Sequence, residues 1–230
     1  MKTTVLTIIS LLRSYAKNFR DANGILAIEE PEIYLHPQAR KHLYDILKDL
    51  ANSWIQVIYT THDPNFLEIW EFESIRRISK VDDEENPWRK YSKINSLKYE
   101  ELWEFVKNTW WPKTYTRGSI SDFYKSISNH RLSEWFFSNM IILCEWPTEE
   151  LVIPKYFEKD WFKYNPKWIS ILYTTWKWEI PKYWRLFNQF WIPVICLFDN
   201  DNSTYKETNN QLLCNCFNKT IDDLLLSTLK

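Results

Sequence analysis

The chain has 230 residues, of which 45% are hydrophobic and 26% charged, a balance that fits one or two globular domains with cores of their own. Its net charge of −1 gives no global electrostatic sign of a nucleic-acid binder. The cysteines include no Cys-x-x-Cys pair, and the apolar stretch at 5–12 is too short to cross a membrane. These features exclude a disulfide-rich secreted domain and predict a cytoplasmic protein with reduced thiols that does not enter a membrane.

The apolar periodicity predicts strands that alternate with helices. In chain order, the expected elements are a helix at 3–19, a buried strand at 24–28, a helix at 37–52, strands at 55–59, 74–80 and 91–95, and a helical or irregular connector at 98–138. A βαβαβ unit follows, with strands at 140–145, 168–173 and 193–198 and helices at 148–160 and 180–190. Because alternating strands and helices build parallel sheets, the predicted fold class is α/β.

Two of the expected strands end in groups suited to nucleotide hydrolysis. Glu29 and Glu30 end the strand at 24–28, and His62 ends the strand at 55–59. Hydrolysis of a nucleotide needs one carboxylate to hold Mg²⁺ and a second group to orient the attacking water, and a nearby His can contact the γ-phosphate. Taken singly, the acidic run is also typical of a helix start, and the residues around His62 of a helix cap.

The order and spacing of these strand ends resemble the core of ABC-type ATPases, in the branch that includes SMC, RecF-like and OLD proteins. The resemblance implies that Glu29 is the Walker B carboxylate that binds the metal, Glu30 the catalytic carboxylate and His62 the switch histidine, all beside ATP. The sequence departs from the family in two ways, because it has neither a Gly-x-x-x-x-Gly-Lys-Ser/Thr phosphate loop nor an ABC signature loop. We therefore expect that the chain starts inside an ATPase domain and does not hydrolyse ATP by itself.

A second set of carboxylates follows two strands of the βαβαβ unit. Glu145 ends the strand at 140–145, and Asp199 and Asp201 end the strand at 193–198. In an open α/β sheet, ligands bind beyond the carboxyl ends of the strands, and clustered carboxylates suit Mg²⁺ or Mn²⁺. Glu149, one helical turn after Glu145, could serve the same metal or a second one. For Asp199 and Asp201 alone, a polar turn is the competing interpretation.

This pattern resembles the TOPRIM domain, a metal-dependent fold shared by topoisomerases, primases and some nucleases. The resemblance implies that Glu145, Asp199 and Asp201 bind the metal and that Glu145 and Glu149 serve catalysis. Lys177 lies in a segment, 174–183, that is similar to a loop written with glycines in the nuclease branch. It could contact a phosphate, and a solvated loop lysine is the alternative.

An ATPase part followed by TOPRIM resembles the OLD (overcoming lysogenisation defect) family. The resemblance implies a partial ABC-type ATPase at 1–96, a helical connector at 97–138 and a C-terminally truncated TOPRIM nuclease domain at 139–230. It implies an ATP-dependent DNA endonuclease that uses Mg²⁺ or Mn²⁺, forms a homodimer through the ATPase domain, and acts in DNA processing or phage defence. A regulatory or assembly module with a degenerate TOPRIM domain is the alternative. A primase- or topoisomerase-type enzyme fits less well.

Tryptophan and glycine occur in abnormal numbers. The chain has 14 Trp and only 2 Gly, whereas glycine averages about 7% of residues. Adding the tryptophans to the glycines restores that average. Trp54, Trp146, Trp176, Trp178 and Trp191 occupy turn or loop positions where glycine is common. Our hypothesis is that many of these residues come from UGA codons that the source organism reads as glycine; a Trp-rich protein is the alternative.

Overall fold

The computed structural model describes residues 24–53, 55–83, 85–86, 88–108, 117–127, 133–174 and 176–199, together with Leu11 and Ser14. These residues fall into two compact units, one within 1–68 and 129–134 and the other within 69–128 and 135–230. Each unit is described by itself. Leu11 and Ser14 are helical, and the rest of the helix expected at 3–19 lies outside the described residues. No helix in the described ranges is long and apolar enough to cross a membrane.

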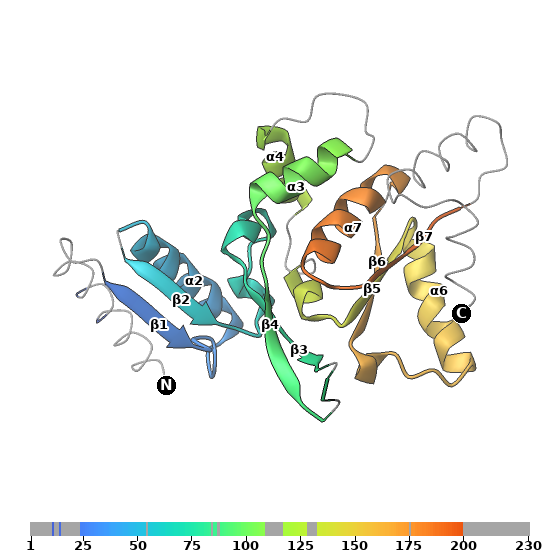
Figure 1. Ribbon diagram of the computed structural model, residues 1–230, viewed down its shortest axis with the longest axis horizontal. Coiled ribbons are helices and arrows are strands. Elements are labelled where there is room, and N and C mark those ends of the chain that lie inside the picture. Colours follow the sequence, from blue (N-terminus) through green and yellow to red (C-terminus); the bar gives the residue numbers. More distant parts are fainter. Residues whose placement is uncertain are drawn as a thin grey trace. The chain divides into compact units, whose positions relative to one another are not determined.

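The first unit contains a parallel strand pair and one helix. Strand β1 (Ile25–Glu29) pairs with β2 (Gln56–Thr60), and α2 (Pro37–Ala51) connects them (Figure 1). The 3₁₀ helix η1 (Pro64–Phe66) packs on α2. In the register of the pair, Glu29 lies opposite Thr60. The two strands therefore end at the same edge, which confirms the parallel arrangement predicted from the alternation of elements.

The core of this unit lies between α2 and one face of the strand pair. Its buried residues are Leu43, Tyr44, Ile46, Leu47, Leu50, Ile55 and Phe66, with Leu26, Ile28, Leu35, Val57 and Tyr59 packed against them. The prediction of a buried strand at 24–28 is wrong for one face of the pair, since Ile25 is 67% exposed and Ile58 on β2 is 51% exposed. The reason is that α2 covers one face only, so side chains along both strands alternate between packed and exposed.

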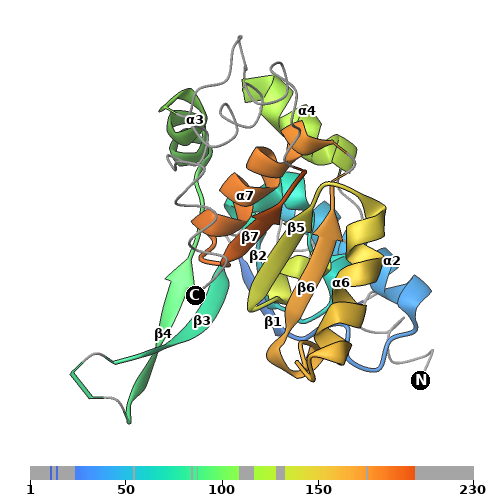
Figure 2. The same ribbon diagram turned by 90° about the vertical axis from the view of Figure 1, so that its right-hand side faces the viewer.

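The second unit is built on a three-stranded parallel sheet. Strand β5 (Met140–Cys144) lies between β6 (Ile169–Tyr173) and β7 (Val194–Leu197). Helices α6 (Pro147–Lys159) and α7 (Ile180–Gln189) cover opposite faces of this sheet (Figures 1 and 2). The βαβαβ prediction is confirmed, and with it the α/β fold class. The order of the strands brings all three carboxyl ends to one edge.

Other elements complete the second unit. The 3₁₀ helix η2 (Ile69–Ser74) precedes an antiparallel hairpin of β3 (Arg77–Asp82) and β4 (Lys90–Asn95). Helices α3 (Tyr99–Asn108) and α4 (Arg117–Ile127) and the 3₁₀ helices η3 (Trp135–Phe137), η4 (Asn165–Lys167) and η5 (Lys177–Glu179) follow. Aromatic rings join η3 to α7, because Phe136 packs edge-on against Phe187 and Phe190, with ring centroids 5.4 and 5.1 Å apart.

Arg77 fastens the hairpin to the sheet domain. Its guanidinium donates to the carbonyl oxygens of Phe136 (3.1 Å), Ser138 (3.1 Å) and Phe190 (3.3 Å). Phe190 is the C-cap of α7, so the positive group also sits where a helix end is negative. Burial lowers the pKa of Arg77, yet arginine stays charged in proteins. The forked geometry of guanidinium is what allows one side chain to reach three separate carbonyls.

We therefore expect Arg77→Lys to lower the free energy of unfolding by about 1–3 kcal/mol, because lysine cannot serve all three carbonyls and leaves some of them unpaired. Denaturant unfolding followed by circular dichroism measures the loss. Arg76→Lys is the matched control, because exposed Arg76 bonds only the nearby carbonyls of Glu73 and Ile75. Equal effects of the two substitutions would contradict this role of Arg77.

Candidate functional sites at the carboxyl ends of the strands

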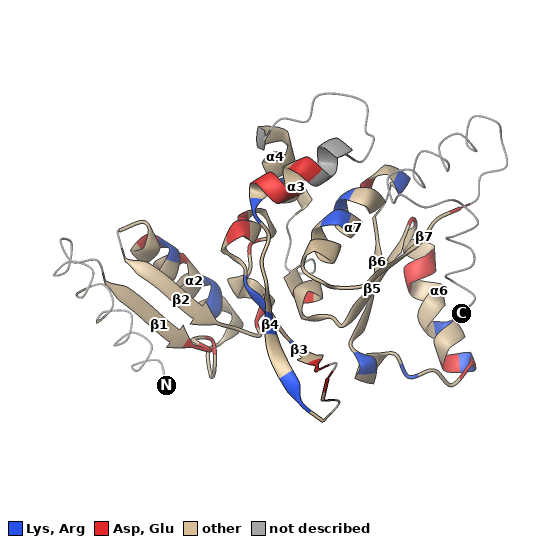
Figure 3. Ribbon diagram, in the orientation of Figure 1, with Lys and Arg blue, Asp and Glu red and all other residues tan. Residues whose placement is uncertain are grey.

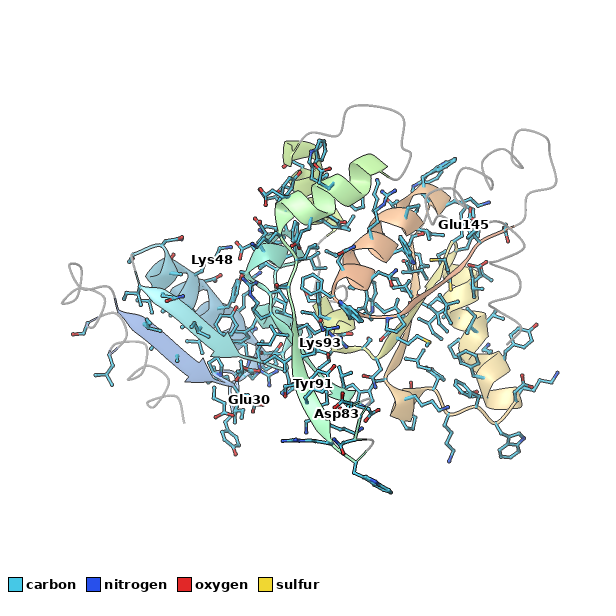
Figure 4. The ribbon with its side chains drawn as sticks, in the orientation of Figure 1. Glu30, Lys48, Asp83, Tyr91, Lys93 and Glu145 are labelled. Carbon is cyan, nitrogen blue, oxygen red and sulfur yellow. The ribbon has the colours of Figure 1, made fainter. Side chains whose placement is uncertain are left out.

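The first candidate site lies where β1 and β2 end. The Glu30 N–H donates to the carbonyl (3.0 Å) and hydroxyl (3.2 Å) oxygens of Thr60. His62 Nε2 lies 3.4 Å from Glu30 Oε1, and the His62 side chain is 83% exposed. The structure thus brings together Glu30 (labelled in Figure 4) and His62, while Glu29 is exposed at the last position of β1. Glu30 also has a φ of 42°, and such strained backbone is concentrated at functional sites.

Glu32 links the loops that carry Glu30 and His62, and sequence reasoning missed it. Its Oε1 accepts hydrogen bonds from the Thr61 hydroxyl (2.5 Å) and the His62 N–H (3.0 Å). The residue is only 7% exposed, and its Oε2 is buried with no hydrogen-bond partner among the described residues. From the sequence, Glu32 has no assigned role, and the acidic run that contains it is typical also of a helix start. The signal that could have identified it is the Pro before it, which favours an extended or turn conformation for Glu30 over a helix.

We expect Glu32→Ala to destabilise the first unit by about 1.5–3 kcal/mol, because two hydrogen bonds to a charged acceptor are lost. Hydrogen exchange of the His62 amide should become faster at the same time. Glu32→Gln is the matched control, since its amide oxygen can accept both bonds and should preserve most of the protection. Slow exchange at His62 in the Ala variant would show that Glu32 does not hold this loop.

Asp63 is a second tie between the helix and the loop after β2. Arg40 on α2 donates from Nη1 to Asp63 Oδ2 (2.6 Å) and from Nε to the Leu35 carbonyl (3.0 Å). Burial works to raise the pKa of Asp63, but hydrogen bonds from the Asn65 backbone and side chain and from Arg40 outweigh it, so the pKa is lowered. The ionised form is therefore the one that the fold prefers.

The sign of this shift sets a pH dependence. Because the folded pKa of Asp63 lies below the unfolded value of about 3.9, its contribution to stability is present above that value and is lost as the pH falls through the folded pKa. Asp63→Asn should therefore flatten the acid limb of a plot of melting temperature against pH. Asp49→Asn, on the exposed face of α2, is the control and should leave the limb unchanged. An unaltered limb in the Asp63 variant contradicts the assignment.

The second candidate site gathers residues from the ends of all three strands of the sheet domain. Glu145, labelled in Figure 4, follows β5 and is 8% exposed. Asp199 follows β7, and Lys177 begins η5 after β6. Lys177 Nζ donates to the Asp199 carbonyl (2.7 Å) and lies 3.7 Å from Glu145 Oε2. The Asp199 N–H donates to that same Oε2 (3.2 Å). The structure therefore brings the backbone of Asp199 to the Glu145 carboxylate, and the prediction that both carboxylates bind one cation stays a prediction.

The burial of Lys177 decides against one of the two interpretations that its sequence position allowed. It is 6% exposed, so the solvated loop lysine is wrong. Thr174 explains part of this placement, because its N–H (3.0 Å) and hydroxyl (3.3 Å) both donate to the Cys144 carbonyl and hold the end of β6 beside the end of β5. A buried ammonium needs a negative partner, and Glu145 supplies it.

Glu149, in the first turn of α6, bonds with its side chain to the backbone of the residues just before the helix. Its Oε2 accepts from the N–H groups of Glu145 (2.9 Å) and Trp146 (3.2 Å), which fixes the turn between β5 and α6. Acidic residues occur in this first turn of α6 and in the loop after β1 (Figure 3). Burial, and then the nearby charge of Glu149, raises the pKa of Cys144 to about 12. The thiol is therefore neutral at pH 7 and is no nucleophile.

The oxygen donors at this edge have the chemistry that a hard divalent cation prefers. Asp201, the third predicted ligand, lies outside the described residues. Within the residues that the structure describes, no group of three or more His, Cys, Asp or Glu side chains is arranged to hold a metal ion. Glu145 and Asp199 are therefore the two predicted ligands that the structure describes at this edge, and their role as metal ligands stays a prediction.

Comparison with known proteins gives matches for both parts of the chain. Residues 3–67 match the AAA ATPase domain family, and residues 136–201 match the overcoming lysogenization defect protein-like TOPRIM domain family. A protein named OLD nuclease from Thermus scotoductus is 44% identical over 62 residues, which are 26% of this chain and 12% of the relative.

Two further relatives match over a longer part of the chain. Endonuclease GajA from Bacillus cereus is 28% identical over 176 residues, 71% of this chain and 24% of the relative. Old nuclease from Escherichia phage P2 is 27% identical over 183 residues, 79% of this chain and 28% of the relative. The chain thus spans between 12% and 28% of the length of these relatives.

Fold, strand-end sites and matches together define a protein that joins an AAA-type ATPase part to a TOPRIM domain. Domains of these two classes use ATP and a divalent metal. Both parts of the chain are thus similar to parts of proteins named OLD nucleases.

Proposed function

We propose that this chain forms part of an ATP-dependent DNA endonuclease of the OLD type that requires Mg²⁺ or Mn²⁺. The observation that carries the proposal is the convergence of Glu145, Lys177 and Asp199 at one edge of the β5–β6–β7 sheet. Phosphodiester hydrolysis needs a cation to neutralise charge on the phosphate and to activate water. Glu145, Asp199 and Asp201 would hold that cation, and the bound metal would supply this chemistry.

Lys177 has a distinct part in this site. Its ammonium already partners Glu145 Oε2 and the Asp199 carbonyl, so it fixes the spacing of the strand ends. A preorganised positive group beside a reacting phosphate also stabilises negative charge that develops there. We infer that Lys177 both positions the carboxylates and favours binding of an anionic DNA backbone. Glu149 would serve by holding the Glu145 backbone or, after a rotamer change, a second cation.

The first unit would couple this nuclease to ATP. Glu30 and His62 lie within 3.4 Å of each other, close enough to share one γ-phosphate and its water. Glu29 would hold the Mg²⁺ of the nucleotide. The resemblance to ABC-type ATPases supports a homodimer around ATP, and DNA processing and phage defence are the roles proposed for the whole protein. The domain boundaries at 96 and 138 also remain proposals.

In the full-length gene product, Glu145→Ala and Asp199→Ala should each lower Mg²⁺- or Mn²⁺-dependent cleavage of plasmid DNA by about a hundredfold or more, because a metal ligand worth several kcal/mol of barrier is lost. The matched control is Glu158→Ala, which removes one exposed carboxylate from the last part of α6, away from the strand ends. Cleavage at the normal rate after Asp199→Ala would mean that this residue belongs to a polar turn only.

A second measurement separates catalysis from an assembly role. Mn²⁺ should raise the melting temperature of the unsubstituted chain, since a ligand that binds only the folded state stabilises it. This rise should disappear in the Glu145 and Asp199 variants and persist in the Glu158 variant. A metal-dependent rise without any DNA cleavage would favour the regulatory or assembly module instead.

A further inference from the structure

Tryptophan occupies an unusual backbone conformation in the second unit. Among the described residues, five have a positive φ, and three of them are Trp161 (58°), Trp168 (56°) and Trp191 (58°). Tryptophan accounts for only 14 of the 230 residues, so this share is far above its frequency. In the left-handed region the Cβ of an L-residue crowds the following carbonyl, and glycine is the residue that usually occupies it.

Backbone hydrogen bonds around Trp161 end helix α6 and turn the chain. Helix α6 has Asp160 as its C-cap, and the next residue, Trp161, donates its N–H to the Glu158 carbonyl (3.2 Å). Phe162 then donates to the Phe157 carbonyl (2.8 Å), and the two phenyl rings pack with centroids 5.0 Å apart. These two bonds and the apolar contact make up the Schellman motif, in which the residue at the Trp161 position is usually glycine.

The same motif ends α7. Phe190 is the C-cap, Trp191 donates its N–H to the Asn188 carbonyl (2.9 Å), and Ile192 donates to the Phe187 carbonyl (3.0 Å). Ile192 and Phe187 are both fully buried, which supplies the apolar contact of the motif.

The 3₁₀ helix η4 repeats the pattern in a shorter form. Trp168 donates to the Asn165 carbonyl (3.0 Å), and Ile169 donates to the Tyr164 carbonyl (3.4 Å). Three independent chain reversals in one domain thus place tryptophan at the position where the backbone itself favours glycine.

The indole groups at these three positions are mostly exposed, so their packing gives no reason for tryptophan there. The exposed fractions are 89% for Trp161, 63% for Trp168 and 64% for Trp191. Trp135 is the contrast, because it is 4% exposed in η3 and packs edge-on against Phe187. An aromatic side chain stabilises a fold by burying its large surface, and only Trp135 among these four does so.

We propose that the native protein carries glycine at positions 161, 168 and 191, where the codon is one that the source organism reads as glycine, and that Trp135 is a true tryptophan. This inference extends the hypothesis drawn from composition, because the backbone selects which tryptophans are glycines. It stands apart from the proposed nuclease function, since it rests on helix ends and not on the metal site.

The backbone conformation does not call for glycine at every tryptophan of this unit. Trp146 (φ −119°) and Trp176 (φ −136°) have extended backbones that any residue adopts, so the geometry makes no demand for glycine at either position. Trp191 has one contact of its own, because Lys93 Nζ lies 3.0 Å from its ring centroid. Trp161 and Trp168 are therefore the cleaner test positions.

The deciding experiment is peptide mass spectrometry of the protein purified from its source cells. Peptides that cover 161, 168 and 191 should have the mass of glycine at each position, and the peptide that covers 135 should have the mass of tryptophan. Tryptophan at 161 and 168 overturns the proposal. Glycine at 135 as well would overturn the claim that the backbone selects the positions.

Variants of the chain as printed give a second, independent test. Trp161→Gly and Trp168→Gly should each raise the melting temperature by about 2–4 °C, as expected for relief of backbone strain of about 1 kcal/mol in a chain of this size. Trp161→Ala and Trp168→Ala are matched controls that remove the indole but keep Cβ, and they should give less of this rise. Trp135→Gly should lower the melting temperature. Equal gains from Gly and Ala would show that exposed indole, and not the backbone, is responsible, and would overturn the argument.

Discussion

Parallel pairing of neighbouring strands is the constraint on which both candidate sites depend. In a parallel pair the carboxyl ends lie at the same edge, so residues far apart in sequence meet there. The register that places Glu29 opposite Thr60 brings Glu30 to His62, and the register that places Cys144 opposite Leu197 brings Glu145 to Asp199. The helices that connect these strands provide the core, and the polar chemistry is confined to the edge.

The two sites share one kind of hydrogen bond. In each, a carboxylate after one strand accepts the backbone N–H of the segment after the neighbouring strand: Glu32 accepts from His62, and Glu145 accepts from Asp199. Backbone donors have fixed directions, so such bonds hold a loop more precisely than contacts between two flexible side chains.

Much of this arrangement could be predicted from the sequence, and the failures have physical causes. Apolar runs that stop at Glu145 and Asp199 are visible in the sequence. Because the carboxyl ends of parallel strands lie at one edge, these runs predict that the two residues lie close together. Burial of Lys177 could not be predicted, because it depends on Thr174 joining two strand ends through backbone bonds. The exposure of Ile25 was missed because an apolar strand reads the same whether one face or both are covered. The bonds of Glu32 involve residues 29 and 30 positions further along the chain, beyond any local pattern.

The ammonium of Lys177 also separates two events that small metal-binding domains often combine. Where clustered carboxylates have no counter-charge, their mutual repulsion makes the ion a structural requirement, and removing it unfolds the domain. Here a covalently attached cation, itself almost wholly buried, already balances Glu145 and bonds the chain at Asp199. The sheet edge can therefore acquire its shape during folding with no ion present. In the proposed nuclease, loading and release of the metal would then be steps of its working cycle and not of the assembly of the protein.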